Sequence, residues 1–269
     1  IAVPGMTVLG RIGENEVRAL SCPSAGNCAV AGTYQDANYN MRAFVVDEVH
    51  GTWQTAIEIP GLAAVKHDAA LVTSVSCSSA GNCAVGGYDH RGAFAASEVS
   101  GIWKAAQFIK VTAHGRTRPA YAITSLSCAS AGGCSAGGIF ITGTGRPQPF
   151  VVSEVRGAWR VGTEVGGIER LDQDTTVGNV WVSCWSPGNC QAAGFFSSQQ
   201  VLFTVYVVGE VGGSWGSARL LPGLAALNKG GNSEVGSLSC LLGYCAIAGT
   251  YADKAGNVLH VQVFTDSAR

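Results

Sequence analysis

A cysteine-bearing segment occurs five times along the chain and limits its fold more than any other feature. The first copy, Val17 to Gly32, reads V-R-A-L-S-C-P-S-A-G-N-C-A-V-A-G. The other copies span 72–87, 123–138, 180–194 and 235–249. Their first cysteines stand at positions 22, 77, 128, 184 and 240, so five units account for nearly all 269 residues. Repetition at this period indicates a repeat architecture.

Each copy predicts a β-hairpin closed by a disulfide. Alternating apolar and small polar residues flank a Gly-Asn turn, which is the pattern of a hairpin, and a hairpin brings its two cysteines within bonding range. The expected pairs are Cys22–Cys28, Cys77–Cys83, Cys128–Cys134, Cys184–Cys190 and Cys240–Cys245. A single recurring C-x5-C lacks zinc-ligand spacing, so we expect no metal site. Local cysteine pairs predict an oxidising compartment and therefore a secreted, extracellular protein.

The rest of each unit predicts a propeller blade. In the first unit a third apolar run, Ala43 to Val49, is followed by a G-x-W turn (Gly51, Trp53) and by a fourth run that ends at 60–61. Four short strands per repeat are typical of a β-propeller blade. The fifth unit ends after its third run, whereas residues 1–9 (I-A-V-P-G-M-T-V-L) resemble the fourth-run segment 57–65. We therefore predict an all-β, five-bladed β-propeller with four antiparallel strands per blade, in which the N-terminal strand closes the last blade.

This interpretation makes residues 1–269 a single domain. The expected blades cover approximately 10–65, 66–112, 113–168, 169–227, and 228–269 plus 1–9. No apolar run reaches the roughly 18 residues of a membrane helix, and a net charge of −1 offers no basic surface for nucleic acid. We expect no membrane span, no nucleic-acid partner, no cofactor and a monomer. The chain begins without Met or an export signal, so we expect a mature protein or a domain of a longer one.

The loops of such blades divide between two faces. The face with the disulfide hairpins and G-x-W turns hardly changes from unit to unit, whereas the loops of the other face vary. A carboxylate recurs at one position of the third strand, as Glu48, Glu98, Glu154 and Glu210. Four equivalent copies favour a structural role in hydrogen bonding over a catalytic acid. The G-x-W tryptophan is likewise expected to pack between blades rather than to stack on a sugar.

The variable loops carry the candidate ligand-binding residues. An aromatic residue follows the second strand in every unit, with Asp close behind it in units one, two and five. An aromatic ring beside Asp and Asn suits the hydroxyls of a neutral sugar. The alternative is that the ring packs between blades while Asp and Asn satisfy the turn. The candidates are Tyr34, Asp36, Asn38, Tyr88, Asp89, His90, Tyr251, Asp253 and Asn232.

Two resemblances bear on function. The pattern S-C-x-S-A-G-N-C-A-x-G-G followed by A-F-V-V-x-E-x-x-G-x-W resembles tandem units of secreted actinobacterial proteins and covers all five units. The closed five-unit architecture resembles the five-bladed lectins of the tachylectin-2 type, which implies sugar binding in equivalent pockets between blades. The repeat sequence of those lectins is absent, so no binding residue is carried over. Lectin propellers also serve as targeting modules of larger secreted assemblies, including toxin particles.

Three functions are compatible with these observations. The preferred one is a lectin-like carbohydrate-binding module, whose weak sites act together on a glycan or polysaccharide surface. The second is a polysaccharide-active glycoside hydrolase or lyase, which needs two carboxylates. The non-repeated acids that would serve it are Glu16, Asp68, Glu169, Asp172, Asp174 and Glu234. The third is a scaffold for another secreted protein. We assign no catalytic residue and expect binding rather than catalysis.

Overall fold

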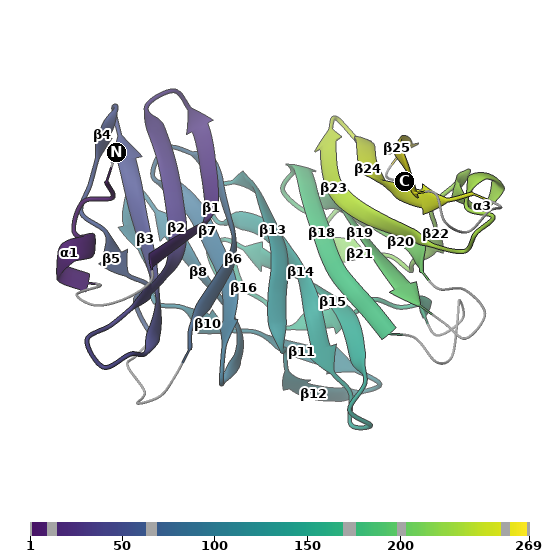
Figure 1. The fold of residues 1–269 in the computed structure, drawn as a ribbon, viewed down its shortest axis with the longest axis horizontal. Helices are drawn as coiled ribbons and strands as arrows, with labels where there is room; N and C mark the ends of the chain where they lie inside the picture. Colours follow the sequence, from purple (N-terminus) through teal and green to yellow (C-terminus); the bar gives the residue numbers. More distant parts are fainter. Residues whose placement is uncertain are drawn as a thin grey trace.

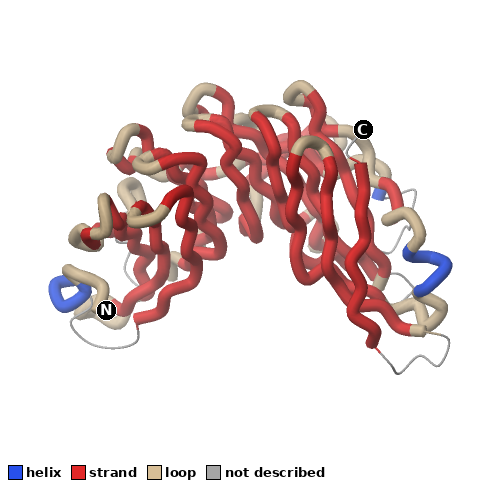
Figure 2. The backbone as a smooth tube through the Cα atoms, turned by 90° about the horizontal axis from the view of Figure 1, so that it is seen from above, coloured by secondary structure: helices blue, strands red, loops and turns tan. Residues whose placement is uncertain are grey.

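Five sheets, antiparallel except for the β11–β17 pair of the third, follow one another along the chain and stand side by side in an arc (Figure 1, Figure 2). The structure, a computed structural model, describes residues 2–9, 15–62, 69–168, 176–197, 203–253 and 259–267. A short helix, α1 (Met6–Leu9), precedes the first sheet, and α3 (Leu224–Leu227) lies between the fourth and the fifth. No helix in these ranges is long and apolar enough to cross a membrane. The arrangement is a β-propeller fold, as the sequence predicts.

The first four sheets are complete blades. Blade 1 contains β1 (Asn15–Ser24), β2 (Asn27–Gln35), β3 (Met41–Val49), β4 (Thr52–Trp53) and β5 (Ile57–Glu58). Blade 2 contains β6 (Leu71–Ser79), β7 (Asn82–Asp89), β8 (Gly92–Val99), β9 (Ile102–Trp103) and β10 (Gln107–Phe108). Blade 3 contains β13 (Ala122–Ser130), β14 (Gly133–Ile141), β15 (Pro147–Val155), β16 (Ala158–Trp159) and β17 (Gly162–Glu164). Blade 4 contains β18 (Thr176–Ser186), β19 (Asn189–Ser197), β20 (Thr204–Val211), β21 (Ser214–Trp215) and β22 (Arg219–Leu220).

The fourth strand of each blade is split into two short pieces that pair with the same third strand. In blade 1, β4 pairs with the end of β3 and β5 pairs with its middle, at Phe44↔Glu58. The turn between β3 and β4 places both His50 and Gly51 at positive φ, which is the geometry of a tight hairpin turn. Blade 3 is extended by a further hairpin, β11 (Lys110–Ala113) and β12 (Arg116–Pro119), which joins it through β17.

The disulfide predictions are confirmed. All five cysteine pairs bond within their own hairpin, with Cα atoms 3.9–4.1 Å apart. In the four complete blades the disulfide hairpin is also bonded to the G-x-W turn; in blade 1, Gly51 N donates to Gly26 O at 2.8 Å. A Cβ on Gly26 would lie 2.9 Å from Gly51 N, so this close approach requires glycine. The hairpins and G-x-W turns therefore share one face, as expected.

The hydrophobic cores lie between neighbouring sheets. The core between blades 1 and 2 contains Val45, Val85 and Trp103, and that between blades 2 and 3 contains Trp159. The structural role expected for the repeated tryptophan and glutamate is confirmed at two interfaces. Glu154 accepts a hydrogen bond from Ser97 Oγ of the preceding blade at 2.6 Å, and Glu210 accepts one from Ser135 Oγ at 2.9 Å.

The prediction of five complete blades closed by the N-terminal strand is wrong. The structure contains four complete blades and a last sheet of three strands, β23 (Ser233–Leu241), β24 (Tyr244–Ala252) and β25 (Leu259–Ser267). In the described part of the chain β25 pairs only with β24. The N-terminal segment lies at the opposite end of the arc, beside blade 1 (Figure 1).

The physical reason lies in what the segment contacts. Pro4 O accepts a hydrogen bond from Ala56 N of blade 1 at 2.9 Å, just as Pro60 O accepts one from Ala106 N of blade 2 at 2.7 Å. Val3 and Met6 pack into the outer core of blade 1, as Ile59 and Leu62 pack into blade 2. The sequence similarity between the two segments therefore reflects contact with the following blade. It does not reflect pairing with the last one.

Candidate functional site

A cavity of about 640 Å³ lies between blades 1 and 2, on the face of the disulfide hairpins and G-x-W turns. Its polar lining includes Asp47 from β3 and Glu98 from β8. Trp103 of the second G-x-W turn and the disulfide Cys77–Cys83 contribute to its walls. The two carboxylates therefore come from facing strands of adjacent blades.

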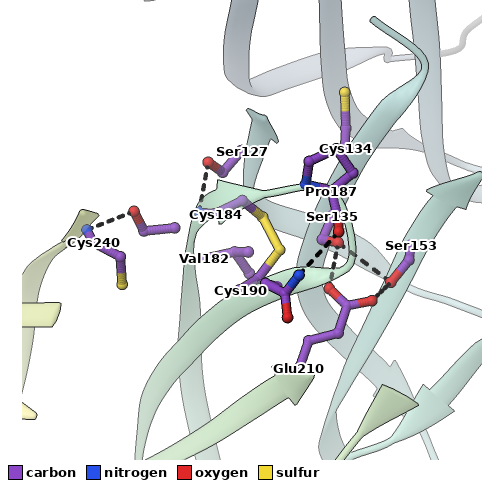
Figure 3. Close-up of a disulfide and its surroundings, with 12 residues drawn as sticks. Ser127, Cys134, Ser135, Ser153, Val182, Cys184, Pro187, Cys190, Glu210 and Cys240 are labelled. Carbon is purple, nitrogen blue, oxygen red and sulfur yellow. Dashed lines mark hydrogen bonds between the residues drawn. A yellow bond between two sulfur atoms is a disulfide. The ribbon is translucent and has the colours of Figure 1, made fainter. Parts of the chain in front are cut away.

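Repeat symmetry shows what is unusual at this interface. The residue before the repeated glutamate is Asp47, Ser97, Ser153 and Gly209 in blades 1 to 4. At the next two interfaces the serine bridges two groups of the next blade: Ser153 Oγ donates to Glu210 Oε1 at 2.5 Å and accepts from Trp215 Nε1 at 3.0 Å. Figure 3 shows Glu210 with Ser153 and Ser135 beside it. Asp47 replaces this serine between blades 1 and 2.

Asp47 keeps one of the two bonds and loses the other. Trp103 Nε1 donates to Asp47 Oδ2 at 2.9 Å, as the other tryptophans donate to serine. An ionised carboxylate has no hydrogen to donate, so Asp47 cannot donate to Glu98 as Ser97 donates to Glu154. Asp47 Oδ1 and Glu98 Oε2 are buried and have no hydrogen-bond partner among the described residues. Each acid thus presents an unpaired oxygen.

Burial and like charge change the protonation of this pair. Glu98 is only 2% exposed. Its burial, together with the negative charge of Asp47, raises the pKa of Glu98 to about 7. Burial also raises the pKa of Asp47, against the opposing effect of the hydrogen bond from Trp103. Glu98 is therefore protonated below about pH 7 and about half protonated at neutral pH, while the Trp103 bond favours the ionised form of Asp47.

Three sequence-predicted residues line a second cavity on the opposite face. Tyr88, Asp89 and His90 surround a space of about 620 Å³ between blades 2 and 3, with Tyr121 on its other side. The rings of Tyr88 and Tyr121 stack with centroids 6.1 Å apart. Asp89 is buried and pairs with Arg91 at 2.6 Å. This loop therefore presents aromatic and charged groups to one cavity.

The candidates of blade 1 do not form such a cavity. Tyr34 is buried, packs on Phe44 and donates to Glu58 Oε2 at 3.4 Å. Asp36 Oδ1 accepts from the backbone N–H groups of Asn38 and Asn40. Although burial opposes the shift, hydrogen bonds from Asn40, Asn38 and Arg42 lower the pKa of Asp36 to about 2. These contacts favour the alternative role of this loop, in which the ring packs and the polar groups satisfy the turn.

The candidates of the last sheet form a third, separate group. Tyr251 stacks on His260 with centroids 5.1 Å apart, and His260 Nε2 lies 3.1 Å from Asp253 Oδ2. Asn232 donates its backbone N–H to Asn228 Oδ1 at 2.9 Å. The nine predicted residues thus lie in three different sheets, and only the blade 2 group lines a described cavity.

The acid pair of the first cavity was missed by the sequence analysis. Glu98 was interpreted as structural because it repeats, and Asp47 was not considered. The sequence signal for this pair is Asp47, an acid at a strand position that is Ser or Gly in blades 2 to 4. Of the acids considered instead, Glu16 is exposed and pairs with Arg18 at 2.7 Å, and Glu234 is exposed. The others, Asp68, Glu169, Asp172 and Asp174, lie outside the described residues.

Comparisons with known proteins show the fold. Neither a protein-family model nor a curated protein matches the sequence. The structure is similar to a protein of unknown function from Dyadobacter fermentans, with a TM-score of 0.55 and 10% identity over 97% of this chain and 81% of that one. It is also similar to a Hadza microbial sialidase, with a TM-score of 0.51 and 9% identity over 94% of this chain and 56% of that one. The resemblances to actinobacterial repeat proteins and to tachylectin-2-type lectins stay predictions.

Proposed function

We propose that the protein is a secreted glycoside hydrolase in which Asp47 and Glu98 act as the acid pair. The observation that carries this proposal is the replacement of the bridging serine by Asp47, which sets two carboxyl groups against each other in a cavity. The fold shared with a sialidase supports a role on glycans. Five disulfides support secretion.

The environments of the two acids fit different roles. Glycoside hydrolysis needs one carboxylic acid that protonates the leaving oxygen and one carboxylate that acts as nucleophile or base. Glu98, with its pKa raised to about 7 by burial and by Asp47, remains about half protonated at neutral pH and supplies the acid. Asp47, fixed through Oδ2 by Trp103, supplies the carboxylate. We assign Glu98 Oε2 and Asp47 Oδ1, which are buried and have no hydrogen-bond partner among the described residues, to the substrate.

The cavity has a size and lining suited to a sugar. Its volume of about 640 Å³ falls in the range of small-molecule sites, roughly 300–1,000 Å³. Trp103 and Ile102 provide apolar surface, whereas Gln54 and Asn27 provide amide groups for hydroxyls. A glycosyl unit bound here would contact apolar and polar groups together, as carbohydrate ligands require.

Hydrolysis of a panel of aryl glycosides, including sialosides, and of bacterial and plant polysaccharides tests this proposal. Glu98→Gln and Asp47→Asn should each lower kcat by at least about 100-fold, the usual effect of losing an acid or base. Glu154→Gln is the matched control, because Glu154 is the equivalent glutamate of the next interface and bonds to Ser97. Absence of turnover on the whole panel, or full activity of both variants, would refute the assignment.

A second candidate function is glycan binding in the cavity between blades 2 and 3. The stacked Tyr88 and Tyr121 rings beside buried Asp89 favour it, because aromatic surface next to polar groups is typical of sugar sites. This candidate retains the lectin-like interpretation for one loop. It can coexist with hydrolysis, since the two cavities lie on opposite faces.

Titration calorimetry with oligosaccharides tests the binding site. Tyr121→Ala should weaken binding at least tenfold, because it removes the exposed half of the aromatic pair. Tyr39→Ala is the matched control, since Tyr39 is an exposed loop tyrosine of blade 1 outside the cavity. Equal affinities of the two variants would contradict the assignment, and Glu98→Gln should bind normally.

A further inference from the structure

One hydrogen bond recurs at every interface between sheets. The backbone N–H of the first cysteine in a hairpin donates to the serine that precedes the equivalent cysteine in the sheet before it. The four bonds are Cys77 N to Ser21 Oγ, Cys128 N to Ser76 Oγ, Cys184 N to Ser127 Oγ and Cys240 N to Ser183 Oγ, at 2.9–3.0 Å. Figure 3 shows the bonds at Cys184 and Cys240. Each sheet thus offers a serine to one neighbour and a cysteine N–H to the other.

At the two ends of the arc, one residue that could accept this hydrogen bond and one that could donate it do not make it. Ser239 in β23 is the equivalent of Ser183, and Cys22 in β1 is the equivalent of Cys240. Neither makes the interface bond in the described structure. The last sheet therefore ends in the serine side of an interface, and blade 1 begins with the cysteine side.

Apolar side chains at the two ends are exposed where their equivalents are buried. Leu20 in β1 is 60% exposed, although its equivalents Val75, Leu126 and Val182 are buried against the preceding sheet. At the other end, Val263 in β25 is 59% exposed, although its equivalents Val45, Ala95, Val151 and Val207 are fully buried. Val261, two residues earlier on the same face, is 80% exposed. Both ends thus present surface that the other interfaces bury.

The strand edge of the last sheet is also incomplete. In the four blades the third strand pairs with a short fourth strand, for example at Tyr206↔Leu220 in blade 4. The equivalent of Tyr206 in β25 is Gln262, which has no such pairing in the described residues. The N-terminal segment stands against blade 1 in the position that a preceding blade's fourth strand and exit would occupy, because Pro4 O bonds to Ala56 N.

We propose that a second copy of the chain docks head to tail, with the last sheet of one copy packing against blade 1 and the N-terminal segment of the next. The occupant is argued from the contacts inside the chain, since the same interface is already formed four times. Val261 and Val263 cover Val17 and Leu20, Ser239 Oγ accepts from Cys22 N, and the β25 edge pairs with Ala2 and Val3. The N and C ends lie far apart on the arc, so one chain does not join its own ends (Figure 1, Figure 2).

Such an interface is heterologous, because two different surfaces meet. Heterologous contacts build rings when the rotation closes and open filaments when it does not. They also cover the exposed edge of β25, which would otherwise be a site of uncontrolled strand pairing. The sequence predicts a monomer, and the unmatched ends are the reason to propose self-association instead.

Sedimentation velocity over a wide range of protein concentration tests the proposal with the full chain. The wild-type protein should form species larger than one chain in a concentration-dependent manner. Leu20→Asp and Val263→Asp should each sediment as single chains, because each destroys one of the two surfaces. Both side chains are exposed within the chain, so these variants should fold, which circular dichroism verifies. Val161→Asp is the matched control, since Val161 is exposed away from both ends and should leave assembly unchanged.

A mixture of the two variants provides the sharpest readout. Leu20→Asp retains an intact last sheet and Val263→Asp retains an intact blade 1, so the mixture should form a dimer and stop there. A wild-type protein that remains a single chain at every concentration would overturn the proposal. Slow hydrogen exchange of the amides at 261–263 in such a single chain would instead indicate closure within one molecule. Assembly of either variant alone to the wild-type extent would also overturn it.

Discussion

The indole Nε1 of Trp103 donates a hydrogen bond to Asp47 Oδ2 at 2.9 Å, whereas the equivalent Trp159 donates to Ser97 Oγ at 3.1 Å. The difference is one residue in an otherwise repeated arrangement. It converts a bridging hydroxyl into a second carboxyl group beside Glu98. Features that break repeat symmetry at a cost in stability are expected at functional sites.

Restoring the serine should therefore stabilise the protein and abolish hydrolysis. In Asp47→Ser the hydroxyl can donate to Glu98 as Ser97 donates to Glu154, and the like charge is removed. One added buried hydrogen bond contributes about 1 kcal/mol to the free energy of unfolding. Urea unfolding at pH 7.5 measures the gain. The reverse change, Ser97→Asp, is the control and should destabilise the protein, because it places an uncompensated acid beside Glu154. A destabilised Asp47→Ser variant would contradict this account.

The stability of the protein should fall as pH rises from about 5 to 8. Burial and the charge of Asp47 raise the pKa of Glu98 from 4.5 to about 7, so the folded state holds a proton that the unfolded state releases. Below the pKa that Glu98 has in the unfolded state, this group does not lower the free energy of unfolding. Its destabilising effect grows with pH until the pH exceeds the pKa of Glu98 in the folded state. The full effect is at most about 3 kcal/mol, at 1.36 kcal/mol per unit. Solvent in the cavity reduces this effect on the free energy of unfolding.

Glu98→Gln isolates this contribution, because the amide does not titrate. Its free energy of unfolding should vary less with pH than that of the wild type between pH 5 and 8. A weaker dependence remains, since burial also raises the pKa of Asp47 and of Glu154. Chemical unfolding across this pH range measures both slopes. Identical slopes for variant and wild type would show that Glu98 is ionised in the folded protein.

Reduction of the disulfides should lower the melting temperature sharply. Chain-entropy arithmetic for a loop of about seven residues gives roughly 2.4 kcal/mol per bridge, an upper value because short hairpins retain structure when reduced. Five bridges together are comparable with a typical net stability of about 5–15 kcal/mol. Calorimetry with and without reductant, with thiol titration to verify reduction, measures the change. An unchanged melting temperature after complete reduction would show that packing alone maintains the blades.

Local patterns allowed most of the fold to be predicted. The hairpins, the disulfides and the position of the G-x-W tryptophans follow from turn residues, alternation and cysteine spacing, which act over a few residues. The interface bonds of Glu154 and Glu210 follow the prediction that an acid repeated at one position of the third strand has a structural role. These features are fixed within one unit or between neighbouring units.

Closure and the acid pair depend on other kinds of information. The resemblance of residues 1–9 to 57–65 is equally compatible with pairing to the last sheet and with packing on blade 1, and the bond between Ala56 N and Pro4 O identifies the second. Asp47 was not recognised because its significance requires knowing that the equivalent serines contact the next blade. Tyr34 was predicted to face a ligand because the sequence does not show on which side of the strand end its ring packs.

The loop of blade 1 provides a test of whether its acid serves structure. Asp36 accepts hydrogen bonds from Asn38, Asn40 and Arg42. Asp36→Ala leaves these donors without their acceptor, so it should lower the free energy of unfolding by about 1–3 kcal/mol.

Because the pKa of Asp36 is lowered to about 2, its contribution to stability is present above the unfolded value of 3.8 and is lost as pH falls through 2. The wild type should therefore lose more stability than the variant between pH 5 and 2. Asp253→Ala is the control and should have a smaller effect, because the Asp253 side chain is 42% exposed. Oligosaccharide affinity should not change with Asp36→Ala. A loss of affinity without a loss of stability would restore Asp36 as a ligand-binding residue.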